Sequence, residues 1–288
     1  MATATPLVPP SFGRYLTEPA QRRWLAALPE LARHHLGRWD LTRDGPTLYG
    51  HTAIVLPVRR ADGAPAVLKL GLPHREAAHE ALGLSLWDGD GAVRLLDHDA
   101  DDWALLLERL DPHHSLDDEP LAAALEVVAA LVRRLDRPAP AGVRTLAEIA
   151  ERWAATFPLD NADGRVPAEL VEQAVAYCRE LGPTSAARLV NEDLHFENVL
   201  RADREPWLVI DPKPLSGDPE FGLIPLLTNR IDESDPVERL AWLVEATGAD
   251  PDRARRWTFV RALDDWIDGE DDTNPAVAGA PRIARALA

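Results

Sequence analysis

The segment from residue 189 to 214, LVNEDLHFENVLRADREPWLVIDPKP, holds three polar side chains at spacings that could do chemistry. Asp193 and Asn198 lie five residues apart in a polar turn, and Asp211 ends a second apolar run, WLVI. Carboxylate and amide oxygens at strand ends on one side of a sheet are what a magnesium–nucleotide site needs. The segment therefore predicts phosphoryl-transfer chemistry.

Two residues nearer the N-terminus could complete such a site. Lys69 lies in the strand-like run AVLKL, where its ammonium could meet nucleotide phosphates, and Glu80 on the following helix could pair with it. Asp193 could then accept a hydrogen bond from the substrate hydroxyl, while Asn198 and Asp211 could bind the magnesium ion. The order strand lysine, helix glutamate, Asp-x4-Asn and Asp is that of the protein-kinase architecture.

Each of these residues alone also has an ordinary structural explanation. A strand lysine is usually a solvated edge residue, and Glu80 could be an exposed helix acid, with Glu76 as a rival partner for Lys69. An Asp-x4-Asn pair can arise by chance. The order and placement of the whole set are more specific than its members, and the sequence has no zinc-type His/Cys spacing, G-x-S-x-G motif or Walker loop.

The elements that must position these residues fall into two parts. Residues 1–110 are expected to form N-terminal helices and a small antiparallel sheet with one inserted helix. The expected strands lie at 51–58, 65–70, 93–99 and 103–110, and the inserted helix at 76–87. Asp62-Gly63, between the first two strands, is a hairpin signal. Residues 111–288 are expected to be mainly helical, with a pair of short strands around RADREP, so the fold class is α+β.

The composition limits the partners that this chain could bind. Its 48 acidic and 31 basic residues give a formal net charge of −17, which would repel nucleic acid. No apolar run approaches the roughly 20 residues of a membrane span. The start, MATATPLVPPSF, has no signal-peptide pattern, so we expect a cytoplasmic protein. We also expect it to be a monomer or a homodimer. Cys178 is expected to be a buried small hydrophobe rather than a nucleophile.

The run NEDLHFENVLRADREPWLVIDPKPLSGDPEFGLIPLL resembles the aminoglycoside and hydroxyurea antibiotic-resistance kinases, particularly the streptomycin 6-phosphotransferase type. That family shows H-G-D-L-H-x-x-N-V-L and then W-L-A-I-D-P-K-P-L-x-G-D-P. The resemblance extends to VRRADGAPAVLKL, WDGDGAVRLLDHD, LLLERLD and RARRWTFVRALDDWIDGED, and thus covers most of the chain. It implies a protein-kinase-like two-lobed fold, ATP with Mg²⁺ between the lobes, and phosphate transfer to a small-molecule hydroxyl.

The resemblance also implies a role for each matched residue. Asp193 would be the catalytic aspartate, in a C-lobe of residues 111–288 that carries the catalytic loop and the acceptor site. The nucleotide-covering N-lobe would be residues 1–110. The expected nucleotide and metal contacts are Lys69 and Glu80 at the phosphates, backbone groups of Glu108 and Leu110 at the adenine, and Asn198 and Asp211 at the magnesium ion.

The sequence departs from the family pattern at three places. Asn191-Glu192 replaces the usual His-Gly before Asp193, Glu197 replaces a common Gly, and Gly222 replaces an acid that braces the catalytic loop in relatives. Glu192 places an extra acid beside Asp193, which could favour a cationic acceptor or perturb the site.

The acceptor is expected to be a cationic hydroxylated small molecule. The acids expected in its pocket are Glu192 and, from DDWIDGEDD, Asp264, Asp265, Asp268 and Glu270; an ordinary solvated acidic surface is the alternative. The leading hypothesis is an ATP-dependent kinase of an aminocyclitol antibiotic such as streptomycin. The alternatives are a kinase of hydroxyurea, of an amino sugar or of a natural-product intermediate, and a nucleotide-binding pseudokinase.

Overall fold

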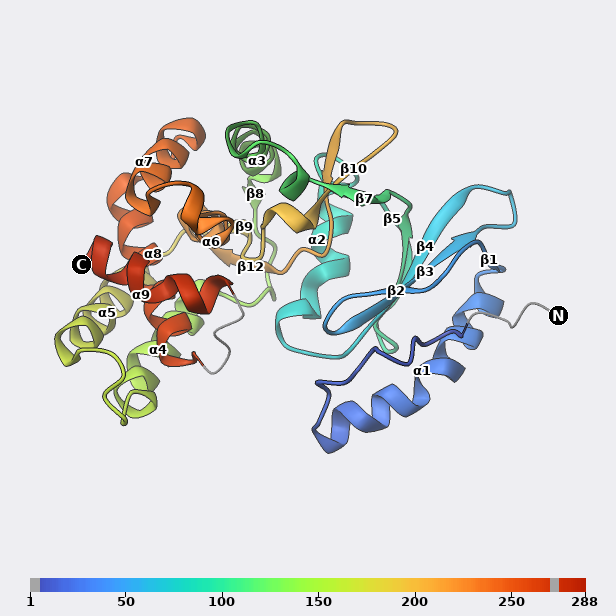
Figure 1. Cartoon of the computed structure of the whole chain (residues 1–288), viewed down its shortest axis with the longest axis horizontal. Helices are drawn as coiled ribbons and strands as arrows, with labels where there is room; N and C mark the ends of the chain where they lie inside the picture. The colour runs from blue at the N-terminus through green and yellow to red at the C-terminus, as the bar shows by residue number, and fades with distance from the viewer. Residues whose placement is uncertain (1–5, 270–274) are drawn as a thin grey trace. The chain divides into compact units, whose positions relative to one another are not determined.

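The computed structural model describes residues 6–269 and 275–288 and divides the chain into two compact units (Figure 1). The first unit runs to Asp111 and includes residues 202–204, and the second holds residues 112–201 and 205–288. The first is built mainly on strands and the second mainly on helices. Among the helices of the described ranges, none has both the length and the apolar character needed to cross a bilayer.

An antiparallel sheet forms the centre of the first unit. Its strand order is β1-β3-β4-β6-β5, and β2 also pairs with β3. The elements are α1 (Pro19–Arg38), β1 (Thr42–Arg43), β2 (Leu48–Tyr49), β3 (Ala53–Arg59), β4 (Pro65–Gly71), α2 (Glu80–Trp87), β5 (Leu95–Asp99) and β6 (Ala104–Glu108). β3 and β4 pair along their whole length around Gly63, whose φ is +81°. A positive φ favours glycine, so the hairpin expected at Asp62-Gly63 is confirmed.

The two faces of this sheet have different environments. Leu56 of β3 and Leu68 of β4 are fully buried and pack with Leu28 of α1 in one apolar cluster. Side chains alternate along a strand, so Lys69 lies on the opposite face from Leu68. The apolar face thus fixes the strand against α1, and the lysine is presented on the other face.

Helices make up most of the second unit (Figure 1). They are α3 (Leu121–Leu135), α4 (Leu146–Asp160), α5 (Ala168–Leu181), α6 (Pro225–Thr228), α7 (Pro236–Thr247), α8 (Pro251–Ile267) and α9 (Pro275–Leu287). Side-chain caps fix three of the starts: Thr145 accepts from the Glu148 N–H at α4, Asp235 caps α7, and Asp250 caps α8. α5 packs against α4 and α8, and α8 against α9.

Two small sheets complete the second unit. Their strand orders are β11-β10-β7 and β12-β9-β8. The strands are β7 (Asp111–Ser115), β8 (Arg137–Pro138), β9 (Arg188–Asn191), β10 (Val199–Arg201), β11 (Trp207–Val209) and β12 (Pro214–Gly217). The β10–β11 pair confirms the strands expected around RADREP, whereas the antiparallel β9–β12 pair was not predicted.

Candidate active site

The hairpin of β10 and β11 places Asn198 beside Asp211. Val199 pairs with Val209, and the Ile210 N–H donates to the Asn198 carbonyl oxygen at 2.8 Å. Asp211 follows directly, with a φ of +47° that turns the chain out of the strand. Asn198 and Asp211 therefore leave adjacent ends of one hairpin.

The turn that carries Asp193 is fixed from both sides. Asn198 Nδ2 donates to the Asp193 carbonyl oxygen at 3.1 Å, and Asn191 Oδ1 accepts from the Asp193 N–H at 3.1 Å. The turn and the β10–β11 hairpin are thus joined through Asn198. Asn198 and Asp211 offer amide and carboxylate oxygens, a donor set that suits a hard divalent cation such as Mg²⁺.

The Asp193 carboxylate forms an ion pair with Lys213. Lys213 Nζ lies 2.9 Å from Asp193 Oδ2, and the two side chains are 25% and 28% exposed. The register of β9 and β12, with Asn191 opposite Pro214, brings Lys213 alongside the turn. The carboxylate is thus held by a neighbouring cation while still reaching the surface.

Glu192, next to Asp193, has the opposite environment. Its side chain is 6% exposed and forms an ion pair with Arg144, and Arg261 Nη1 lies 4.0 Å from Glu192 Oε2. Arg261 also contacts Asp265, with 3.4 Å between Nε and Oδ1. The extra acid of this chain is therefore buried, and its charge is compensated by the buried Arg144 and the partly exposed Arg261.

Gly222, where the family pattern led us to expect an acid, has little space around it. A Cβ at this glycine would lie 3.1 Å from Val190 Cγ1 and 3.2 Å from the Asn191 carbonyl oxygen. A side chain at this position would therefore require its neighbours in β9, the strand that leads to Asp193, to shift slightly. The side chain of Asn191 links the turn at Asp193 to the segment at Lys213, because its Oδ1 accepts from the N–H groups of both residues.

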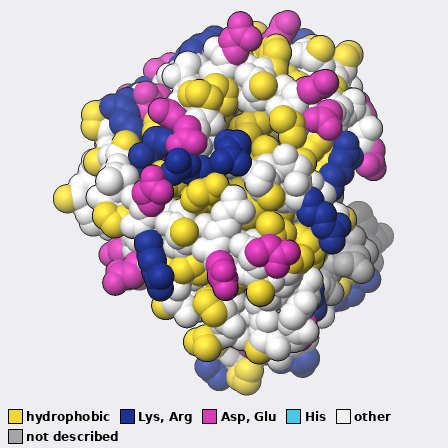
Figure 2. Space-filling model, turned by 90° about the vertical axis from the view of Figure 1, so that its left-hand side faces the viewer, with side chains coloured by type: hydrophobic (Ala, Val, Ile, Leu, Met, Phe, Trp, Pro, Cys, Tyr) yellow, Lys and Arg dark blue, Asp and Glu magenta, His cyan; other side chains and the backbone are white. Residues whose placement is uncertain are grey.

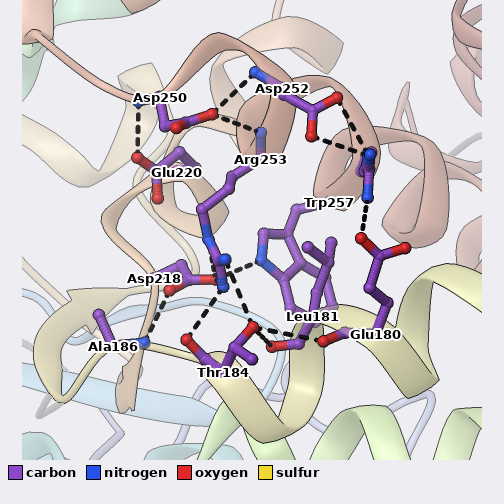
Figure 3. Close-up of polar contacts among 11 residues, drawn as sticks. Glu180, Leu181, Thr184, Ala186, Asp218, Glu220, Asp250, Asp252, Arg253 and Trp257 are labelled. Atoms are coloured by element: carbon purple, nitrogen blue, oxygen red, sulfur yellow. Dashed lines mark hydrogen bonds and ion pairs between the residues drawn. The ribbon is translucent and has the colours of Figure 1, made fainter.

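A buried carboxylate, Asp218, fixes the first half of α8 (Figure 3). Asp218 is 2% exposed and accepts from the Ala186 N–H at 2.7 Å, Arg253 Nε at 2.9 Å and Trp257 Nε1 at 2.6 Å. Glu220 adds a bond from the Asp250 N–H at the start of the helix. The first half of α8 is thus fixed to the segment after β12, and its second half carries Arg261 to Glu192.

The acids expected in the acceptor pocket lie on or just beyond α8. Burial, aided by the charges of Asp265 and Asp268, raises the pKa of Asp264 to about 7. Burial and the charge of Asp160 raise the pKa of Asp268. Asp265 contacts Arg261, and Glu270 lies outside the described residues.

Cys178 lies on α5, which packs against α4 and α8. Its side chain is buried, and burial, with a smaller effect of the Asp264 charge, raises the pKa of the thiol to about 12. The expectation of a buried small residue is confirmed. Asp264 therefore lies near α5, in a less solvated place than a surface acid.

In the first unit, Lys69 and Glu80 form a buried ion pair. Lys69 Nζ donates to both carboxylate oxygens of Glu80, at 2.6 and 2.7 Å, and the residues are 7% and 5% exposed. The strand lysine is thus held in one orientation by α2.

Glu108 and Leu110 lie at the end of β6 and just after it. The Glu108 carboxylate accepts from Arg204 Nε at 2.8 Å and from the Arg94 N–H at 3.1 Å, and its backbone N–H donates to the Arg94 carbonyl oxygen. Leu110 is partly buried. These bonds hold the end of the strand, and adenine binding by the two backbones stays a prediction.

One face of the protein, where α4, α5 and α7 lie, can be seen directly. Figure 2 shows basic side chains interspersed with acidic and apolar ones on this face. The excess of acids over bases is therefore not gathered there into one acidic patch.

Sequence reasoning missed three basic residues that contact Asp193 or its neighbour Glu192. Lys213 stands two residues after Asp211, at the end of the same apolar run, so the pattern that drew attention to Asp211 could have included it. Arg144 and Arg261 reach Glu192 from distant segments. No local pattern points to them.

Comparison with known proteins identifies similar sequences along nearly the whole chain. The profile of the aminoglycoside/hydroxyurea antibiotic resistance kinases matches residues 38–267. A streptomycin 6-kinase of Streptomyces glaucescens is 42% identical, covering 96% of this chain and 94% of its own length. A hydroxyurea phosphotransferase of Kitasatospora aureofaciens is also 42% identical, over 87% of this chain and 77% of its own.

Solved structures with low sequence identity share the fold. A choline kinase, LicA, from Streptococcus pneumoniae has a TM-score of 0.59 at 12% identity, covering 90% of this chain and 98% of its own. A putative fructosamine-3-kinase from Thermobifida fusca has a TM-score of 0.55 at 18% identity, covering 85% and 93%. The α+β, protein-kinase-like two-lobed fold expected from the sequence is confirmed.

Proposed function

The chain belongs to the aminoglycoside/hydroxyurea antibiotic resistance kinase family, and from this we propose that it phosphorylates a hydroxyl of an aminocyclitol antibiotic such as streptomycin, with ATP as donor. The observation that supports transfer chemistry most is the arrangement of Asp193, Asn198 and Asp211 on one turn and one hairpin. The choice of acceptor is based on the 42% sequence identity with the streptomycin 6-kinase, which extends over 96% of this chain. We place the protein in the cytoplasm, where ATP is available, as a monomer or homodimer.

In this proposal the residues divide the work of the transfer. Asp193 accepts the proton of the acceptor hydroxyl as a bond forms between that oxygen and the terminal phosphorus and the bond to the ADP oxygen breaks. Asn198 and Asp211 hold Mg²⁺, which supplies charge neutralisation at the phosphates. Lys69, oriented by Glu80, contacts the phosphates, and backbone groups of Glu108 and Leu110 contact the adenine.

In this proposal the buried Glu192 does not contact the acceptor. Its charge is compensated by Arg144 and Arg261, so it positions the turn before Asp193 instead of attracting a cation. A cationic acceptor would meet Asp265 on α8 and Asp268 just beyond its end. Binding through such charges should weaken as salt rises.

A kinase of hydroxyurea is the second candidate, because the hydroxyurea phosphotransferase is as similar in identity as the streptomycin 6-kinase. Hydroxyurea is a small neutral molecule, whereas streptomycin is cationic. The acids of α8 therefore favour streptomycin. The presence of Lys69, Asp193, Asn198 and Asp211 together disfavours a pseudokinase.

An acceptor panel tests this proposal. The purified chain would be incubated with ATP·Mg and streptomycin, hydroxyurea or a neutral sugar, with the products identified by mass and ³¹P NMR and with Asp193→Asn as control. Thermal shift reports acceptor binding separately, because a ligand of the folded state raises the Tm. We expect phosphorylated streptomycin and a salt-sensitive shift. Phosphorylated hydroxyurea without any effect of streptomycin would establish the alternative, and ATP binding without transfer to any acceptor would support a pseudokinase.

A further inference from the structure

The chain contains only two lysines. They are Lys69 and Lys213, and the other 29 basic residues among the 31 are arginine. Arginine carries a planar guanidinium, whereas lysine carries a compact ammonium, and the two are not interchangeable where one atom must approach a phosphate or carboxylate oxygen. A chain that uses arginine for almost every cation thus keeps lysine at two positions, and both contact a carboxylate.

From these contacts we propose that Lys213 is a second phosphate-binding catalytic residue, which holds Asp193 in the free enzyme and donates to the terminal phosphate of the bound nucleotide. The proposal rests on the proposed function. It concerns a residue of the second unit for which the sequence suggested no role.

The backbone fixes Lys213 on both sides. Its N–H donates to Asn191 Oδ1 at 3.0 Å, and its carbonyl oxygen accepts from the Glu192 N–H at 3.1 Å. Both partners directly precede Asp193 in the chain. The lysine is therefore built into the turn that carries the proposed base, and its 2.9 Å contact with Asp193 follows from the β9–β12 pairing.

The charges around Asp193 explain why a cation is needed there. Asp193, Asp211 and an incoming phosphate are all anionic, and bringing them together without compensation is unfavourable. The nearby arginines have other partners, because Arg144 binds Glu192 and Arg261 binds Asp265. Lys213 is the residue whose ammonium contacts the proposed base itself.

Partial exposure lets this ion pair change partners. A pair that reaches solvent contributes little to stability, so moving the ammonium toward a phosphate oxygen loses little. During transfer Lys213 keeps its protons and only donates hydrogen bonds. The hydroxyl proton passes to Asp193, the acceptor oxygen bonds to phosphorus, and the leaving oxygen stays with ADP. Donors aimed at developing charge are among the strongest contributors to rate.

The two-lysine composition provides a direct test that does not depend on turnover. Protein labelled with ¹³C-lysine should give two Cε signals, which the Lys213→Arg variant assigns. We expect the Lys213 signal to move when the Mg²⁺ complex of a non-hydrolysable ATP analogue binds, and to move far less with ADP·Mg. In calorimetry, the ratio of the affinities for the analogue and for ADP should be about tenfold smaller in Lys213→Met than in the wild type. Its transfer rate should fall about 10²-fold.

Matched variants separate this role from a structural one. Arg256→Met removes a similarly exposed cation, 22%, from an ion pair with Glu180, and should leave nucleotide preference and transfer unchanged. Lys213→Arg should keep part of the preference, because it keeps the charge. An unchanged Lys213 signal with the ATP analogue, or a folded Lys213→Met that keeps full preference and rate, would overturn the proposal. If Lys213→Met does not fold, the wild-type signal and Lys213→Arg still decide. If the wild type prefers the ATP analogue to ADP but phosphorylates no acceptor, the proposed function is refuted, whereas the proposal for Lys213 is not.

Discussion

The two lysines form ion pairs of contrasting environment in the two units. Lys69 binds both oxygens of Glu80 at 2.6 and 2.7 Å, with side chains 9% and 7% exposed. Lys213 meets Asp193 at 2.9 Å, with side chains 25% and 28% exposed. The first pair is closed off by a strand and a helix, whereas the second reaches solvent at the end of a turn.

The contrast indicates which ion pair has a structural role and which can exchange partners. Removing one partner of a buried pair leaves an uncompensated charge in a poorly solvated place, which is strongly unfavourable. Water replaces much of what is lost when a partly exposed pair breaks. We therefore infer that Glu80 fixes Lys69, while Asp193 is held loosely enough to act on a substrate.

The largest effect on stability should come from breaking the buried pair. Glu80→Leu would leave the Lys69 ammonium without its carboxylate, so we expect the free energy of unfolding to fall by about 3–5 kcal/mol. Chemical denaturation measures this value. The double variant Lys69→Met/Glu80→Leu should recover most of the stability, whereas Asp193→Asn should change it by less than about 1 kcal/mol. Equal losses in Glu80→Leu and Asp193→Asn would remove the contrast between the pairs.

A smaller effect is expected at Glu192, the buried acid beside the base. Glu192→Gln keeps a hydrogen-bond acceptor for Arg144 but removes the charge, so unfolding should become easier by about 2 kcal/mol. If Glu192 positions the turn, kcat should fall while the KM for ATP stays the same. A raised KM for a cationic acceptor, with kcat unchanged, would instead indicate that Glu192 contacts the acceptor.

A pH dependence of stability is expected to originate at Asp264. Its pKa is raised from an ordinary 3.8 to about 7 by burial, so the folded state binds this proton more tightly than the unfolded state does. The resulting stability is fully present below about pH 4 and is lost as pH rises through 7. The Tm of the wild type relative to Asp264→Asn should therefore fall between pH 4 and 7 and then level off. A constant difference in Tm across this range would contradict the assignment.

The sequence could predict what depends on local pattern. The apolar runs around RADREP indicated the hairpin that places Asn198 beside Asp211, and the spacing of Lys69 and Glu80 indicated a pair that the structure contains. β1 and β2, with two residues each, were too short to show a pattern. Contacts made across long separations, such as Arg144 with Glu192, carry no local signal, so the burial of that acid could not be foreseen.

The central claim, that Asp193 is the base of an ATP-dependent transfer, separates Asp193 from Asp211 by function. Asp211 is assigned to the metal ion, so Asp211→Ala should weaken ATP·Mg binding as well as turnover. Asp193 is assigned to the acceptor hydroxyl, so its loss should spare nucleotide binding.

The most direct measurement is single-turnover phosphate transfer to streptomycin by Asp193→Asn, paired with calorimetric titration of ATP·Mg. A positioned base contributes about 10²–10⁴-fold, so we predict transfer slowed by that factor with nucleotide affinity unchanged. Near-wild-type transfer by Asp193→Asn would contradict the account.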